Sequence, residues 1–221
     1  HYLVGKTQCQ FIVDALDLDN QDGPFNIEMV TGDPGDNNVN FFFGGAMDVL
    51  QPYIDAGKLV VPSGQMTKDE VATANWATDA AQARFENILS SNYADGTPLH
   101  AVLASNDSTA LGVTNALAAN YTNDVYPVIT GQDCDIANVP NIVNGKQAMS
   151  VFKDTRTLAT KVVEMVDAIM TGGEAPVNDT KTYDNGTGII PSYLCEPVAV
   201  TADNYKEILI DSGYYTEDQI Q

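Results

Sequence analysis

The chain has 221 residues, of which 10 are Lys or Arg and 30 are Asp or Glu, so its formal net charge is -20. This acidity argues against nucleic acids and anionic membrane surfaces as partners, because both are bound through clustered Lys and Arg. The hydrophobic fraction of 44% is ordinary for a globular protein, and no apolar run approaches the roughly 20 residues that span a bilayer. We therefore expect a folded chain without nucleic-acid partners and without membrane insertion of its own.

Ten elements alternate between helix and strand along the first two thirds of the chain. Apolar periodicity predicts helices at 5–16, 38–54, 74–91, 107–121 and 135–145, and strands at 25–30, 58–63, 99–105, 125–131 and 147–152. Strands that alternate with helices in this way build βαβ units. The sequence thus predicts an α/β fold, a doubly wound and mostly parallel sheet with helices on both faces.

The alternation stops after residue 153. A strong helical pattern at 154–173 ends in two glycines, and a loop follows at 174–188. Residues 189–200 are expected to be extended, and residues 201–215 to form a last helix.

Polar side chains follow each predicted strand where the chain turns into the next helix. In a parallel sheet these turns share one edge, which is where ligands bind. Carboxylates accept hydroxyl protons, amides donate and accept, and an ammonium donates, so such a set suits a sugar. The only Trp lies on the same edge, and its face suits the C–H surface of a sugar ring. The candidate binding residues at these strand ends are Asp33 to Asn38, Asn106, Asp107, Gln132, Asp133, Asp135, Lys153 and Asp154, together with Trp76.

Simpler roles compete with these assignments. Asp36 and Asp107 precede or begin predicted helices and are typical of helix caps. Trp76 could be a core residue, and Lys153 could be an ordinary surface lysine. The binding hypothesis rests on the shared edge rather than on any single residue.

Catalytic and metal chemistry find little support. The chain lacks the G-x-S-x-G elbow, the P-loop and the G-x-G-x-x-G motif, so we expect no enzyme and no cofactor. Residues 17–28 resemble a calcium loop, but Gly23 comes one position late for that motif, and an acidic solvated loop without metal is expected. The three cysteines, Cys9, Cys134 and Cys195, are far apart in the sequence and predict free thiols.

Five stretches resemble the type I periplasmic sugar-binding proteins of ABC transporters, especially the xylose-binding and multiple-monosaccharide-binding group. They are "GDPGDNNVNFFFGGAMDVLQPYIDAGKLVV", "VLASNDSTALG", "TGQDCDIANV", "SVFKDTRTLA" and "PVAVTADNYKEILIDSGYY", in the order of that family. The resemblance implies a periplasmic binding protein-like fold that lacks most of its N-terminal lobe. It also implies sugar contacts at Asn38, Asn106, Asp133 and Lys153, with Trp76 as the stacking platform.

The same resemblance divides the chain into three parts. Residues 1–153 would form the C-terminal sugar-binding lobe, 154–190 a crossing helix and strand, and 191–221 a return crossing and tail. The implied protein is a monomeric extracytoplasmic receptor, in the periplasm or at the cell surface with a lipid anchor, that delivers a monosaccharide to a membrane permease. The alternative is the effector-binding core of a LacI-type transcription regulator, which shares the fold.

Overall fold

The computed structural model describes residues 1–220. The chain divides into two compact units, one made of His1–Phe152 and Ala199–Gln221 and the other of Lys153–Val198. Each unit is described by itself. Within residues 1–220, no helix is both long enough and apolar enough to cross a membrane.

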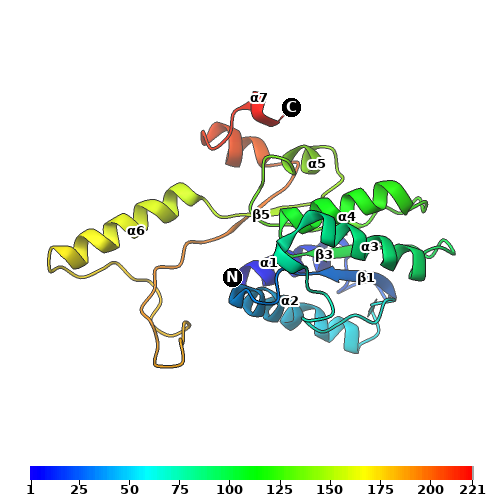
Figure 1. Cartoon of the computed structure of the whole chain (residues 1–221), viewed down its shortest axis with the longest axis horizontal. Helices are drawn as coiled ribbons and strands as arrows, with labels where there is room; N and C mark the ends of the chain where they lie inside the picture. Colours follow the sequence, from blue (N-terminus) through cyan, green and yellow to red (C-terminus); the bar gives the residue numbers. More distant parts are fainter. Residues whose placement is uncertain (221) are drawn as a thin grey trace. The chain divides into compact units, whose positions relative to one another are not determined.

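The first unit is built on a four-stranded parallel sheet (Figure 1). Its strands are β1 (Phe25–Val30), β2 (Leu59–Val60), β3 (Ala101–Ala104) and β4 (Val128–Ile129), in the spatial order β2-β1-β3-β4. β1 and β3 pair over four residues, from Ile27 opposite Ala101 to Val30 opposite Ala104. The predicted fold class, a doubly wound parallel sheet, is confirmed.

Helices connect these strands. The longer ones are α1 (Tyr2–Ala15), α2 (Asn37–Asp55), α3 (Thr78–Asn92) and α4 (Asp107–Asn120), and α3 follows a 3-10 turn, η1 (Ala74–Trp76). The unit also contains α5 (Val139–Val143), β5 (Ser150–Phe152), a π-helical segment η2 (Lys206–Asp211) and α7 (Glu217–Ile220). β5 pairs with β6 (Val198–Val200) in a separate two-stranded sheet.

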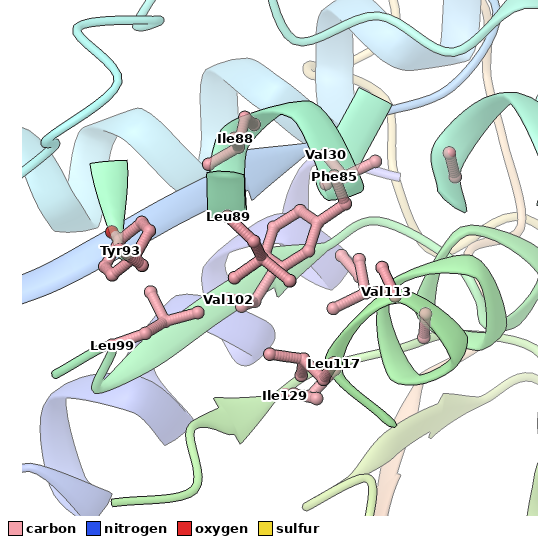
Figure 2. Packing of buried hydrophobic residues seen from close by; sticks show 14 residues of the cluster. Val30, Phe85, Ile88, Leu89, Tyr93, Leu99, Val102, Val113, Leu117 and Ile129 are labelled. Atoms are coloured by element: carbon pink, nitrogen blue, oxygen red, sulfur yellow. The ribbon is translucent and has the colours of Figure 1, made fainter. Parts of the chain in front are cut away.

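Alternate residues of the central strands enter two different cores, one on each face of the sheet. Ile27, Met29 and Leu103 belong to a cluster that includes residues of α1 and α2. Val102 and Ala104 belong to the opposite cluster, where Phe85 of α3 packs with residues of α4 (Figure 2). This alternation follows from the two-residue period of a strand, and it confirms the expectation of helices on both faces.

Several predicted elements differ from the observed ones. The predicted strands at 58–63 and 125–131 are longer than the observed β2 and β4, which have two residues each. Only these residues form regular pairs with a neighbouring strand. The predicted helix at 74–91 is interrupted, since Asn75 and Trp76 have positive φ angles of 55° that no α-helix accommodates. The last predicted helix, at 201–215, is replaced in part by the π-helical segment η2, and α7 was not predicted.

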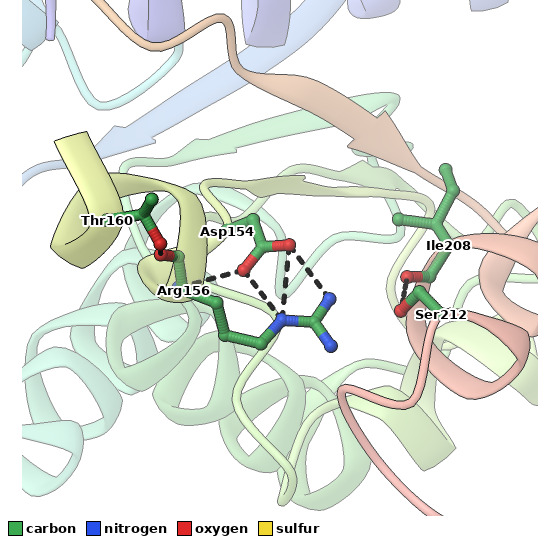
Figure 3. A network of polar contacts seen from close by, with 5 residues as sticks. All are labelled: Asp154, Arg156, Thr160, Ile208 and Ser212. Atoms are coloured by element: carbon green, nitrogen blue, oxygen red, sulfur yellow. Dashed lines mark hydrogen bonds and ion pairs between the residues drawn. The ribbon is translucent and has the colours of Figure 1, made fainter.

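The second unit contains one long helix, α6 (Thr155–Met170). Its N-cap is Asp154, which accepts a hydrogen bond from the Arg156 backbone and from the Arg156 guanidinium (Figure 3). The helix has no buried residues. Its exposed apolar residues are Leu158, Val162, Val163, Val166, Ile169 and Met170.

We predict that Gly112→Ala destabilises the first unit by about 1–3 kcal/mol, because overpacking forces the backbone to shift. A Cβ at Gly112 of α4 would lie 2.4 Å from the Thr78 carbonyl oxygen and 2.8 Å from the Ala81 Cβ. The check is urea unfolding followed by circular dichroism. Gly44→Ala is the matched control, since Gly44 is also helical but a Cβ there meets nothing within 4 Å. The control should gain about 0.5–1 kcal/mol from helix propensity, and equal effects would contradict the prediction.

Candidate functional site

The strand order places a reversal of the chain path between β1 and β3. From β1 the chain crosses to β2 on one side, and then returns to β3 on the other side of β1. The connections that leave the carboxyl ends of β1 and β3 therefore diverge to opposite faces, which opens a crevice where ligands bind in open α/β sheets. Four of the five candidate sugar contacts belong to the first unit, and the fifth, Lys153, directly follows its strand β5.

Trp76 reaches this edge through contacts with the end of β1. The Thr31 amide donates to the Val71 carbonyl (2.8 Å), and the Thr73 amide donates to the Gly32 carbonyl (3.0 Å). The segment that leads into η1 thus runs beside the extension of β1. A Cβ at Gly32 would lie only 2.1 Å from the Trp76 indole, so the ring rests directly on the Gly32 backbone.

Two aspartates after β1 hold the Trp76 turn. Asp33 accepts hydrogen bonds from the backbone amides of Asn75 (2.6 Å) and Gly35 (2.8 Å), and these bonds lower the pKa of the Asp33 carboxyl. Asp36 accepts the indole N–H of Trp76 at 3.3 Å. Charged acceptors strengthen such bonds, so the two carboxylates fix a turn that its positive φ angles would otherwise disfavour.

The packing of the indole agrees with the simpler of its two expected roles, that of a core residue. Trp76 is half-buried and packs against a small cluster that contains Val4 and Met149. Its ring meets Phe42 edge to face, with the ring centroids 6.2 Å apart. The predicted helix at 74–91 would place Trp76 in its first turn, but η1 ends at Trp76 and α3 begins only at Thr78.

Asn38 lies in the first turn of α2 and is half-buried. Its backbone amide donates to the Asp36 side chain at 2.8 Å, which makes Asp36 the N-cap of α2. The expected capping role of Asp36 is confirmed. Because the same carboxylate also accepts the Trp76 N–H, Asp36 links the two loops that carry candidate binding residues.

Asn106 follows β3 and is the N-cap of α4. Its side-chain Oδ1 accepts from the Thr109 amide (3.0 Å), and the Thr109 hydroxyl lies near the Asn106 backbone in return. The alternative role expected for Asp107, that of the cap, is wrong: Asn106 takes that position and Asp107 is the first helical residue. With Oδ1 engaged in the cap, Nδ2 is the side-chain group of Asn106 that a ligand can engage.

Asp133 follows β4 in a bend with unusual backbone angles. Its φ is 94°, and that of Cys134 is 52°. The Asp133 amide donates to the Val151 carbonyl at 2.9 Å, while the residue itself is half-buried. Lys153, the fifth candidate, is half-buried and is the first residue of the second unit.

Sequence reasoning missed the part played by Asp107. This residue is fully buried, and its carboxylate accepts hydrogen bonds from Gln147, Ser150 and the Asp135 amide, each at 2.8 Å. Burial raises the pKa of Asp107 to about 7, against the opposing effect of these three donors. The only signal in the sequence was an acidic residue close to the end of an apolar run, and it was assigned to capping.

The acidic loop before β1 gives no sign of a calcium-binding geometry. Glu28, which would complete the calcium motif, is buried on β1 and accepts from Ser63 and Tyr93 instead. Burial raises its pKa. Within residues 1–220, no three His, Cys, Asp or Glu side chains are gathered where they could hold a metal ion. The thiols of Cys9, Cys134 and Cys195 are free.

A parallel sheet whose chain path reverses between two strands, with amide, carboxylate and indole groups in the segments that follow its strands, is the architecture of a solute-binding lobe. Residues 1–174 match the periplasmic binding protein domain model, and the chain belongs to this family.

Three relatives are particularly similar. One is a solute-binding protein of an ABC transporter from Clostridium phytofermentans, whose structure was solved with bound β-D-glucose. It is 66% identical in sequence, the match covers 100% of this chain and 68% of that protein's chain, and the TM-score is 0.96. The multiple sugar-binding periplasmic protein SbpA of Azospirillum brasilense is 50% identical, and the multiple sugar-binding periplasmic receptor ChvE of Rhizobium radiobacter is 47% identical. Each is matched by 100% of this chain, which spans 62% and 63% of their lengths.

We predict that Gly32→Ala displaces the Trp76 indole, because the added methyl group would occupy the position of the ring. Trp76 is the only tryptophan, so its fluorescence emission should shift to longer wavelength as the ring moves toward water. Overpacking of this kind also costs about 1–3 kcal/mol of stability. Gly44→Ala serves again as the control and should leave the emission unchanged. An unaltered spectrum for Gly32→Ala would show that the ring does not rest on Gly32.

A second prediction concerns pH. The pKa of Asp107 is raised from 3.8 to about 7 in the folded chain, so its contribution to stability is full below about pH 4 and is lost as the pH rises to about 7. Asp107→Asn removes this titration. The difference in unfolding free energy between the unaltered chain and the variant should therefore fall across that interval and then level off.

Urea unfolding of both proteins at a series of pH values measures this difference. The titratable groups that interact with Asp107 are the Asp135 carboxyl, the Cys134 thiol and the Tyr215 phenol. Burial raises the pKa of Asp135 as well, so Asp135→Asn is the control that separates the two titrations. A difference that stays constant or grows with pH would contradict the raised pKa of Asp107.

Proposed function

We propose that residues 1–153 form the sugar-binding lobe of an extracytoplasmic receptor that captures a monosaccharide and delivers it to an ABC transporter. Xylose, glucose, galactose or a similar aldose is the proposed ligand. The observation that carries the proposal is the edge of the sheet at the β1 and β3 ends, where a half-buried Trp, an amide and a carboxylate follow successive strands. These groups bind hydroxyls and a sugar face without chemistry on the ligand.

Each candidate residue has a proposed role. Trp76 is the platform on which the C–H face of the sugar stacks. The Asn106 Nδ2 group donates to a hydroxyl, and the Asp133 carboxylate accepts from one or two hydroxyls. Asn38 adds an amide from the start of α2, and Lys153 adds an ammonium donor.

The remaining segments are proposed to belong to the rest of the receptor. Residues 154–190 would cross into a second lobe, and residues 191–221 would return and form the tail. The exposed apolar residues of α6 support this division, because a helix with a wide apolar stripe normally buries it. The chain also spans only 62% and 63% of two relatives, which leaves room for a further lobe in proteins of that length.

The relatives support the ligand class and the location. SbpA and ChvE are described as periplasmic and as binders of multiple sugars, and the Clostridium protein holds β-D-glucose. We propose that this protein works as a monomer outside the cytoplasm, in the periplasm or lipid-anchored at the cell surface, with a membrane permease as its partner. The LacI-type alternative is disfavoured, since these relatives are described as periplasmic sugar-binding proteins or as a solute-binding protein of an ABC transporter, and the chain carries a charge of -20.

The test is a titration with xylose, glucose, galactose, arabinose and ribose. Calorimetry applies to the protein at its full natural length, and Trp76 fluorescence reports on the 221-residue chain. We expect saturable binding of one or two pyranoses by the full-length protein. Absence of any heat or fluorescence change, in a protein that unfolds cooperatively, would contradict the sugar assignment.

We predict that Asp133→Ala and Asn106→Asp each lower the affinity for the preferred sugar by about 10- to 100-fold. Each removes a hydrogen bond to a hydroxyl in a desolvated site, and about 1.4 kcal/mol corresponds to tenfold. Asn106→Asp keeps the oxygen that caps α4, so the fold is retained. Asp124→Ala is the control, because Asp124 is exposed and lies before β4 rather than after it. Unchanged affinity in either variant would remove that residue from the site.

A further inference from the structure

Asp107 contacts both ends of the segment that carries Asp133. On one side its backbone amide donates to the Gln132 carbonyl at 3.0 Å. On the other side its Oδ2 accepts from the Asp135 amide at 2.8 Å. Asp133 therefore lies between two hydrogen bonds made by the same residue.

Ser150 connects the Asp107 carboxylate to Cys134, the residue between Asp133 and Asp135. The Ser150 hydroxyl donates to Asp107 Oδ1 at 2.8 Å, and it accepts from the Cys134 amide at 3.0 Å. Thus the two amides that follow Asp133 are both held by the Asp107–Ser150 pair. The carboxylate itself is fixed by Gln147, which donates to Oδ1 at 2.8 Å.

The conformation of the segment requires such restraint. Asp133 and Cys134 have φ angles of 94° and 52°, in a region that residues other than glycine seldom occupy. Residues held there are strained and persist only where the surroundings fix them. Space around Asp107 is also tight, since a Cβ at Gly131 would lie 2.2 Å from its Oδ1. The bond from the Asp133 amide to Val151 is a further anchor.

We propose that Asp107 is the positioning residue for Asp133: it touches no sugar, but it holds the strained segment 132–135 so that the Asp133 carboxylate faces the ligand. Asp107 also directly follows Asn106, so its backbone amide bond to Gln132 connects the ends of β3 and β4. The proposal rests on the sugar-binding function proposed above.

A double-mutant cycle tests this role in the full-length protein at about pH 8, where Asp107 is ionised. We expect Asp107→Asn to weaken sugar binding at least about tenfold, because an amide cannot accept from all three donors. In an Asp133→Asn background the same change should cost much less, since the residue being positioned is already impaired. If the fold-losses of affinity in the two single variants multiply in the double variant, the two residues act independently and the proposal is overturned. Wild-type affinity in Asp107→Asn would also overturn it.

Two further variants keep the test decisive. Glu28→Gln alters another buried carboxylate of the first unit, one that bonds to Ser63 and Tyr93, and it should lower stability while leaving affinity within about twofold. Ser150→Ala removes the link to the Cys134 amide but leaves Asp107, and it should weaken binding by less than Asp107→Asn. If Glu28→Gln weakens binding as much as Asp107→Asn, the effect is one of general stability and the proposal fails.

Amide hydrogen exchange separates this proposal from the sugar-binding function. In Asp107→Asn, the amides of Cys134 and Asp135 should exchange faster than in the unaltered protein, while those of β1 are unchanged. Equal exchange would overturn the positioning role whatever the ligand. If the unaltered protein binds none of the five sugars, the proposed function fails, and the exchange rates still decide whether Asp107 holds the segment.

Discussion

The parallel pairing of β1 with β3 is the constraint on which the rest of the first unit depends. Because β2 lies on one side of β1 and β3 on the other, the loops after β1 and β3 diverge and leave the strand ends accessible. The same pairing aligns Val30 with Ala104, so that Gly32 and Asn106 follow the two strands at nearly the same level. A slip of one residue would send both cores to the wrong faces.

Polar groups at this edge are arranged in two supported sets. On the β1 side, Asp33 and Asp36 hold the turn that carries Trp76. On the β3 and β4 side, Asp107 holds the segment around Asp133. Each set contains a carboxylate, that of Asp33 or Asp107, which is not proposed to contact the ligand. This carboxylate accepts hydrogen bonds from backbone amides, and these bonds maintain positive φ angles beside a proposed ligand contact. Such support is what a preorganised binding site needs, because strain at the site is offset by the bonds around it.

The high acidity of the chain does not determine how the carboxylates of these two sets are held in place. Their carboxylates are held by neutral donors, namely backbone amides, an indole, a hydroxyl and a side-chain amide. The long-range electrostatic field of the protein would have little effect on the binding of an uncharged sugar. The net charge instead affects solubility and the binding of charged partners. In the proposed function, specificity depends on the geometry of individual donors and acceptors, and the proposed contribution of Asp107 comes from a residue that lies out of reach of solvent.

The sequence by itself determined the fold class and the order of strands and helices along the chain. It also determined the edge of the sheet on which polar residues collect, because hydrophobic periodicity and chain connectivity are local properties. It also identified Asn38, Trp76, Asn106 and Asp133 as candidates, whose binding role stays a prediction. Only the tertiary structure decided that Asn106 rather than Asp107 caps α4, that Trp76 lies in a left-handed turn against Gly32, and that Asp107 grips residues 132–135. These features depend on contacts such as that between Asp107 and Ser150, 43 residues apart, which no local pattern encodes.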